Sequence, residues 1–68
     1  MHPRLQTIKE LKALGFVFDR EGANHELYTF PKTNKSIPIK RHKFTENTRR
    51  YILKEAQRII KDAEDKGL

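Results

Sequence analysis

The chain has 68 residues, of which 35% are hydrophobic and 35% charged, and its formal net charge is +6. A domain of about this size buries only about 60% of the surface that its unfolded chain exposes, which leaves little room for a deep substrate pocket. Cysteine is absent, which excludes disulfides and thiolate zinc sites, and no apolar run reaches the ~18 residues of a membrane span. We expect a single domain over residues 1–68 that is soluble and cytoplasmic.

The N-terminal part of the chain predicts a helix followed by a strand. Four apolar residues recur at every third position: Leu5, Ile8, Leu11 and Leu14. Gly15 stands where a glycine commonly ends a helix, so we expect a helix over residues 4–14. The apolar run at residues 16–18 predicts a first strand and core phenylalanines, and residues 19–22 have the composition of a turn.

The middle of the chain predicts two further strands. Residues 25–30 are expected to form the second strand and residues 36–39 the third, with turn-forming residues 31–34 between them. Pro38 cannot donate a hydrogen bond to a neighbouring strand, so we expect the third strand at an edge of the sheet.

The C-terminal part of the chain predicts a long amphipathic helix. Thr45 is a suitable N-cap, and the helix is expected to run to about Lys66. Six apolar residues fall on one face of it: Ile52, Leu53, Ala56, Ile59, Ile60 and Ala63. The order α-β-β-β-α predicts an α+β fold, in which both helices pack on one face of a three-stranded antiparallel sheet and the other face is free for a ligand.

The excess positive charge lies in one segment of the chain. Residues 1–31 and residues 51–68 each contain four basic and four acidic residues, whereas residues 32–50 contain seven basic residues and one acidic residue. A local surplus of this kind attracts polyanions by counterion release, and here it leads into a helix N-terminus, which favours anions. A solvated basic loop is the alternative, and we favour nucleic-acid binding.

A histidine, His25, stands at the start of the second predicted strand and precedes the basic cluster at residues 40–43. Histidine has an unperturbed pKa of about 6.5, so it can take up and return a proton near neutral pH. Metal-independent RNA cleavage needs a base for the ribose 2′-OH, cations for the phosphorane charge and an acid for the leaving oxygen. His25 is a candidate for this base, although a lone histidine at the start of a strand is more often an ordinary surface or half-buried residue.

Four segments, in this order and at this spacing, carry a resemblance to a known family. They are Leu11-Lys12-Ala13-Leu14-Gly15-Phe16, Gly22-Ala23-Asn24-His25-Glu26-Leu27-Tyr28, Arg41-His42-Lys43 and Ile52-Leu53-Lys54-Glu55-Ala56. Over residues 5–56 the chain resembles the HicA (YcfA-like) family of bacterial toxins, which are ribonucleases paired with HicB antitoxins. Asn24 stands where the family commonly has serine, and Gly22 lies one residue further from the histidine than in the commonest family pattern.

The resemblance implies a fold like that of double-stranded-RNA-binding domains and the activity of an mRNA-cleaving endoribonuclease. Such a protein is the toxin of a type II toxin-antitoxin system, neutralised by a HicB-type antitoxin. The family's catalytic histidine corresponds to His25. A second histidine of the family corresponds to Lys40 if residues are counted back from the last helix without gaps, or to His42 if a two-residue deletion is allowed. We prefer His42, because residues 41–43 then match as a block.

The residues expected to bind RNA are basic or can become so: Lys40, Arg41, His42, Lys43 and Arg49. The lysines and arginines need only charge and reach to hold a phosphate, whereas His42 is a phosphate contact, a general acid or an exposed loop histidine. Adjacent helical residues point in different directions, so we expect the side chain of at most one of Arg49 and Arg50 to point directly towards RNA. We expect Tyr28 to pack in the protein rather than to stack on a base.

The predicted partners are mRNA and a HicB-type antitoxin, with no metal, no cofactor and no membrane. One rival interpretation is a non-catalytic RNA-binding module of the same fold, in which His25 is only a contact residue. A second rival is a protein-interaction domain that uses its long C-terminal helix. The fold alone does not decide among them.

Overall fold

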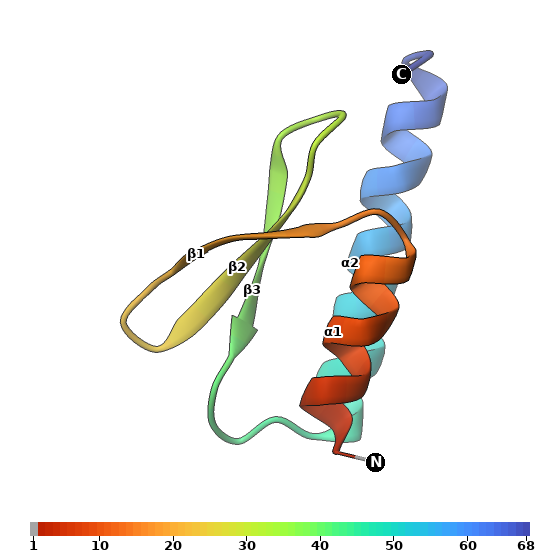
Figure 1. Cartoon of the computed structure of the whole chain (residues 1–68). Coiled ribbons are helices and arrows are strands. Elements are labelled where there is room, and N and C mark those ends of the chain that lie inside the picture. Colours follow the sequence, from red (N-terminus) through yellow and green to blue (C-terminus); the bar gives the residue numbers. More distant parts are fainter. Residues whose placement is uncertain (1) are drawn as a thin grey trace.

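The computed structural model describes residues 2–68 and contains two helices and three strands. In chain order they are α1 (Pro3–Ala13), β1 (Val17–Glu21), β2 (His25–Phe30), β3 (Lys35–Lys40) and α2 (Glu46–Asp65). The strands form one antiparallel sheet in the order β1-β2-β3, and both helices lie on the same side of it (Figure 1). This is the α+β arrangement that the sequence predicted. No helix within residues 2–68 is both long and apolar enough to cross a membrane.

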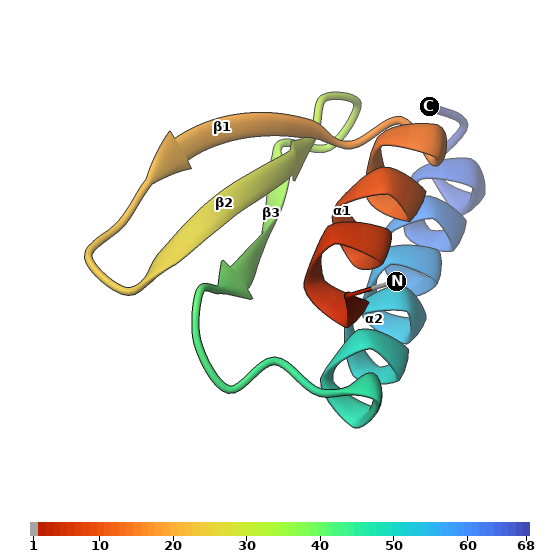
Figure 2. The same cartoon turned by 60° about the horizontal axis from the view of Figure 1, so that its bottom comes forward.

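The C-terminal helix follows its sequence pattern closely. Thr45 is the N-cap of α2, and its hydroxyl accepts a hydrogen bond from the Thr48 backbone N–H at 3.3 Å in a capping box. The buried positions of the helix are spaced as one face requires: Ile52, Ala56, Ile59 and Ala63. The helices α1 and α2 lie side by side on the same side of the sheet, as the turned view in Figure 2 shows.

The N-terminal helix buries a narrower face than its leucines suggested. Leu11 is fully buried, but Leu5 and Leu14 are exposed and Thr7 is buried in their place. A three-residue step falls about 60° short of a full helical turn, so residues nine positions apart lie on opposite sides of the helix. Thr7 is accommodated because its hydroxyl donates to the Pro3 carbonyl at 2.7 Å.

The first strand is longer than predicted. Residues 19–21 belong to β1, and the prediction of a turn over residues 19–22 was wrong. A bulge between Phe18 and Arg20 lets the polar residues of this segment continue to pair with β2. The turn itself lies at residues 22–24 and brings the chain directly to His25.

The core lies between the helices and one face of the sheet. Its sheet side is formed mainly by aromatic and β-branched side chains: Phe16, Tyr28, Phe30, Ile37 and Ile39. The expectation that every phenylalanine is core was wrong for Phe18, which lies on an edge strand and is 48% exposed, with its ring roughly perpendicular to that of Tyr28. Tyr28 itself is 5% exposed, which confirms packing as its role, and burial raises the pKa of its hydroxyl.

The face of the sheet away from the helices is open. Three pairs of residues from β2 and β3 stand opposite one another on it: His25 with Lys40, Leu27 with Pro38, and Thr29 with Ser36. Because β3 pairs only with β2, Pro38 lies on an edge strand, as predicted. The third strand extends one residue further than expected at each end, and this places Lys40 directly across from His25.

Candidate nucleic-acid interface

His25 is held at the tight end of the β1-β2 hairpin. Its carbonyl accepts a hydrogen bond from the Gly22 N–H at 2.7 Å, and its ring folds over the same glycine. A Cβ atom on Gly22 would lie 3.3 Å from His25 Nε2, closer than most side-chain contacts. Glycine at this position therefore leaves room for the half-buried imidazole.

A shallow hollow of about 390 Å³ opens beside this imidazole. It is lined by residues from the β1-β2 turn, the facing ends of β2 and β3, and the bend after β3: Asn24, His25, Lys40, His42 and Lys43. We call this depression, with its five lining residues, the hollow. The bend is sharp, because Lys43 adopts a left-handed φ of 55°, which costs a non-glycine residue about 1 kcal/mol or more. Both candidates for the second active-site position, Lys40 and His42, thus share one depression with His25.

The basic side chains of the hollow are not neutralised by the protein. None of the ion pairs formed within residues 2–68 involves Lys40, His42 or Lys43. All three residues are exposed to solvent. The charges of Lys40 and Lys43 are therefore available to an anionic ligand.

Arg41 shapes the hollow but does not line it. Its Nη1 donates to the Gly22 carbonyl at 2.9 Å and to the Ala23 carbonyl at 3.1 Å, and its Nη2 lies 3.8 Å from the Glu21 carboxylate. These contacts fix the turn that carries His25. Arg41 is thereby a positioning residue, and its predicted contact with RNA stays a prediction.

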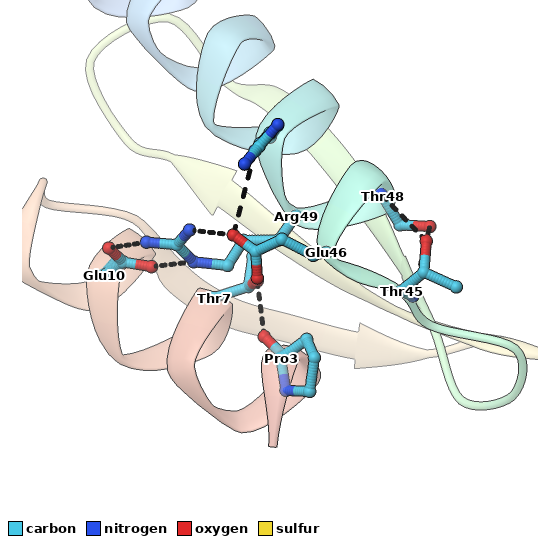
Figure 3. Close-up of polar contacts among 8 residues, drawn as sticks. Pro3, Thr7, Glu10, Thr45, Glu46, Thr48 and Arg49 are labelled. Carbon is cyan, nitrogen blue, oxygen red and sulfur yellow. Dashed lines mark hydrogen bonds and ion pairs between the residues drawn. The ribbon is translucent and has the colours of Figure 1, made fainter. Parts of the chain in front are cut away.

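Arg49 lies in the helical layer, away from the lining of the hollow. Its guanidinium makes a two-pronged hydrogen bond to the Glu10 carboxylate, with distances of 2.8 and 2.7 Å, and donates a third bond to Glu46 (Figure 3). The Arg49 bond lowers the pKa of Glu10, and the bonds to Glu10 and Glu46 raise the pKa of Arg49. We call Glu10, Glu46 and Arg49 the clamp, because they tie α1 to α2. Arg50, by contrast, is 74% exposed and approaches Glu46 only to 4.0 Å.

Arg4 is a contributor that the sequence reasoning missed. From α1 it donates to the Glu26 carboxylate at 2.7 Å and to the Lys40 carbonyl at 2.8 Å, so one guanidinium joins the strand ends that carry His25 and Lys40. Only 16% of its side chain is exposed. The sequence carries no local signal for this role, since the two partners lie 22 and 36 residues away.

The arrangement supplies the groups that cleavage of an RNA chain requires. His25 can accept a proton, Lys40 and Lys43 can hold a phosphate, and His42 provides a second proton-transfer group at the same depression. Within residues 2–68, no group of three or more histidine and carboxylate side chains is placed to hold a metal ion.

Comparisons of the chain with protein-family models, with curated proteins and with solved structures find no match. The resemblance to HicA therefore stays a prediction from the four sequence segments.

Proposed function

We propose that this protein is a HicA-like toxin, a metal-independent endoribonuclease that cleaves mRNA in the cytoplasm and is neutralised by a HicB-type antitoxin. The observation that carries the proposal is the hollow, in which His25 shares a depression with Lys40, His42 and Lys43. Lys40 and Lys43 would attract the phosphate, and the depression leaves the imidazole reachable from solvent.

The proposed reaction uses the ribose 2′-OH as an internal nucleophile. His25 removes its proton while the oxygen attacks the adjacent phosphorus, and the bond from phosphorus to the 5′-oxygen breaks. Lys40 and Lys43 stabilise the added negative charge, and His42 donates a proton to the departing 5′-oxygen. The products are a 2′,3′-cyclic phosphate and a free 5′-hydroxyl, and neither a metal nor a cofactor takes part.

The antitoxin would act by covering the hollow. A partner surface that carries carboxylates and matches the open face of the sheet would neutralise the free charges of Lys40 and Lys43 and block His25. An RNA-binding module without catalysis is the second candidate function, because the same free charges bind RNA whether or not His25 transfers a proton.

A cleavage time course on single-stranded RNA in EDTA tests the proposal. We expect the purified protein to cut the RNA and His25→Ala to lose roughly 10²- to 10⁴-fold in rate while RNA affinity is kept. His2→Ala is the matched control, because His2 lies outside the hollow and its ring only accepts a hydrogen bond from the Arg4 N–H at 3.2 Å. Intact RNA together with salt-sensitive binding would replace the ribonuclease with the binding module.

A further inference from the structure

A second depression continues from the hollow across β3 onto α2. It has a volume of about 520 Å³ and shares His25 and Lys40 with the hollow, so the two form one continuous surface. We call it the groove. Its remaining lining is mainly apolar and comes from β3 and from one face of α2: Ser36, Ile37, Pro38, Thr48, Tyr51, Ile52 and Glu55.

Tyr51 is the most exposed large apolar residue described, with 73% of its surface open to solvent. It immediately precedes Ile52, which is 4% exposed, and successive helical residues are separated by about 100°. Tyr51 is thus turned out of the core stripe and stands at the side of the groove. Its ring does not contribute to the buried core, so its faces are available to a ligand.

The far side of Tyr51 carries cations. A further depression on α2 is lined by three basic residues, one acidic residue and two neutral residues: Lys54, Arg58, Lys61, Glu55, Tyr51 and Gln57. Arg58 is paired with Glu55 at 2.6 Å, but Lys54 and Lys61 take part in no ion pair within the part of the chain that the structure describes. An exposed aromatic ring therefore stands between the cations of the hollow and those of α2.

We propose that Tyr51 is a stacking platform for an unpaired base next to the cleaved phosphate, and that the substrate is single-stranded RNA continuing onto Lys54 and Lys61. This inference rests on the proposed function of the hollow. Single-stranded RNA presents bases and phosphates in alternation, and the surface offers a cationic hollow, an apolar groove with an aromatic ring and then further cations. In a duplex the bases are stacked on one another, so their faces cannot reach the ring.

The charges favour RNA over a protein as the occupant of the groove. The apolar walls alone would suit either ligand, but free lysines lie at both ends of the groove, and only Glu55 within its lining is acidic. Glu55 is itself paired with Arg58, so it repels a phosphate chain weakly.

Binding of a short fluorescent single-stranded RNA to the His25→Ala protein tests this inference without interference from cleavage. We expect Tyr51→Ala to lose roughly 5- to 150-fold in affinity, the range for one stacked base, and Tyr51→Phe to stay close to the parent because it keeps the ring. Tyr51→Ala should leave the slope of log affinity against log salt unchanged, whereas Lys61→Ala should reduce the slope by about 0.7. The same strand in a duplex should bind with no dependence on Tyr51.

Equal losses in Tyr51→Ala and Tyr51→Phe, or no loss in Tyr51→Ala, would overturn the stacking platform. If Tyr51→Ala instead weakened only the binding of an antitoxin protein, the groove would be a protein-docking site and the inference would also be wrong. Failure of the proposed function has a different signature, because the wild-type protein would then leave RNA intact while its affinity still depended on Tyr51. The exposure of Tyr51 predicts an unchanged thermal midpoint in both variants, which calorimetry checks.

Discussion

The hollow and the clamp both contain basic residues from the segment at residues 32–50. In the clamp the basic residue is paired with carboxylates, whereas in the hollow the lysines are not. In the clamp, Arg49 is enclosed by two carboxylates and only 19% of its side chain is exposed. In the hollow, Lys40 and Lys43 have no acidic partner among the residues that the structure describes. A surplus of positive charge in the sequence therefore indicates a binding surface only where the basic side chains are not already paired with carboxylates in the folded protein.

Whether a basic side chain is paired within the protein depends on which carboxylates the fold brings close to it. Glu10 reaches Arg49 because α1 and α2 lie side by side, and Glu26 on β2 takes Arg4 from α1. On the open face of the sheet, the residues of β3 are serine, proline and lysine, so no carboxylate from that strand can reach the hollow. The comparison predicts that changes in the hollow affect RNA and changes in the clamp affect the fold.

The largest effect that would sharpen this comparison is expected at His42. If His42 is the general acid, His42→Ala should slow cleavage by roughly 10²- to 10⁴-fold while the thermal midpoint is unchanged, because the exposed ring contributes little packing. An RNA substrate in which sulfur replaces the leaving 5′-oxygen needs no proton at that atom. Cleavage of this substrate should be restored in His42→Ala and remain slow in His25→Ala, as measured by single-turnover kinetics.

If His42→Ala and His25→Ala cleaved the sulfur substrate equally slowly, His42 would not be the general acid. A small loss on both substrates would make His42 a phosphate contact, which is the other functional role predicted for it.

Next in size is the effect of the lysines on RNA binding. Lys40→Ala with Lys43→Ala should weaken binding several-fold at moderate salt and reduce the slope of log affinity against log salt by about 1.4, since each phosphate contact on a single strand contributes about 0.7. Titrations at several salt concentrations measure the slope. Lys9→Ala with Lys12→Ala is the matched control, because these exposed lysines of α1 line no part of the hollow or the groove. An equal change in the control pair would mean that only net charge matters.

Local patterns were sufficient to predict most of the fold. The periodicity of α2, its Thr45 cap and the edge position of Pro38 depend on neighbours in sequence, and each was confirmed. The first hairpin was placed wrongly because the polar residues 19–21 look like a turn, and only pairing with β2 keeps them in a strand. The exposure of Phe18 has the same origin, since it follows from the position of β1 at the outer edge of the sheet.

The candidate site was harder to predict because it depends on distant residues. Alternation along β2 placed His25 on a face, but the pairing with Lys40 depends on the register of β3. Arg49 was predicted to bind RNA, and its pairing with Glu10 could not be predicted from a local pattern because Glu10 lies 39 residues earlier. Tyr51 could have been found from the sequence, since an aromatic residue one position outside the apolar stripe of a helix must face outward.

The clamp predicts a smaller effect, on stability alone. Arg49→Ala should lower the thermal midpoint by a few degrees, because it leaves Glu10 and Glu46 without their shared partner, and RNA affinity should be kept. Arg50→Ala is a closely matched control, since it removes the same charge one residue away but breaks only a 4.0 Å contact. If Arg49→Ala weakened RNA binding more than Arg50→Ala did, without changing the thermal midpoint, Arg49 would be an RNA-binding residue.

The smallest effect is the response of the clamp to acid. Hydrogen bonding to Arg49 holds the pKa of Glu10 below its ordinary value of 4.5, so the folded protein binds this proton less tightly than the unfolded chain does. The stabilisation is complete above that ordinary value and is lost as the pH falls through the lowered pKa. The midpoint difference between the wild type and Glu10→Gln should therefore be largest near neutral pH and shrink in acid. Other carboxylates titrate in the same range, but they are common to both proteins and largely cancel in the difference. Parallel melting curves across this range would show that Glu10 does not depend on Arg49 for its charge.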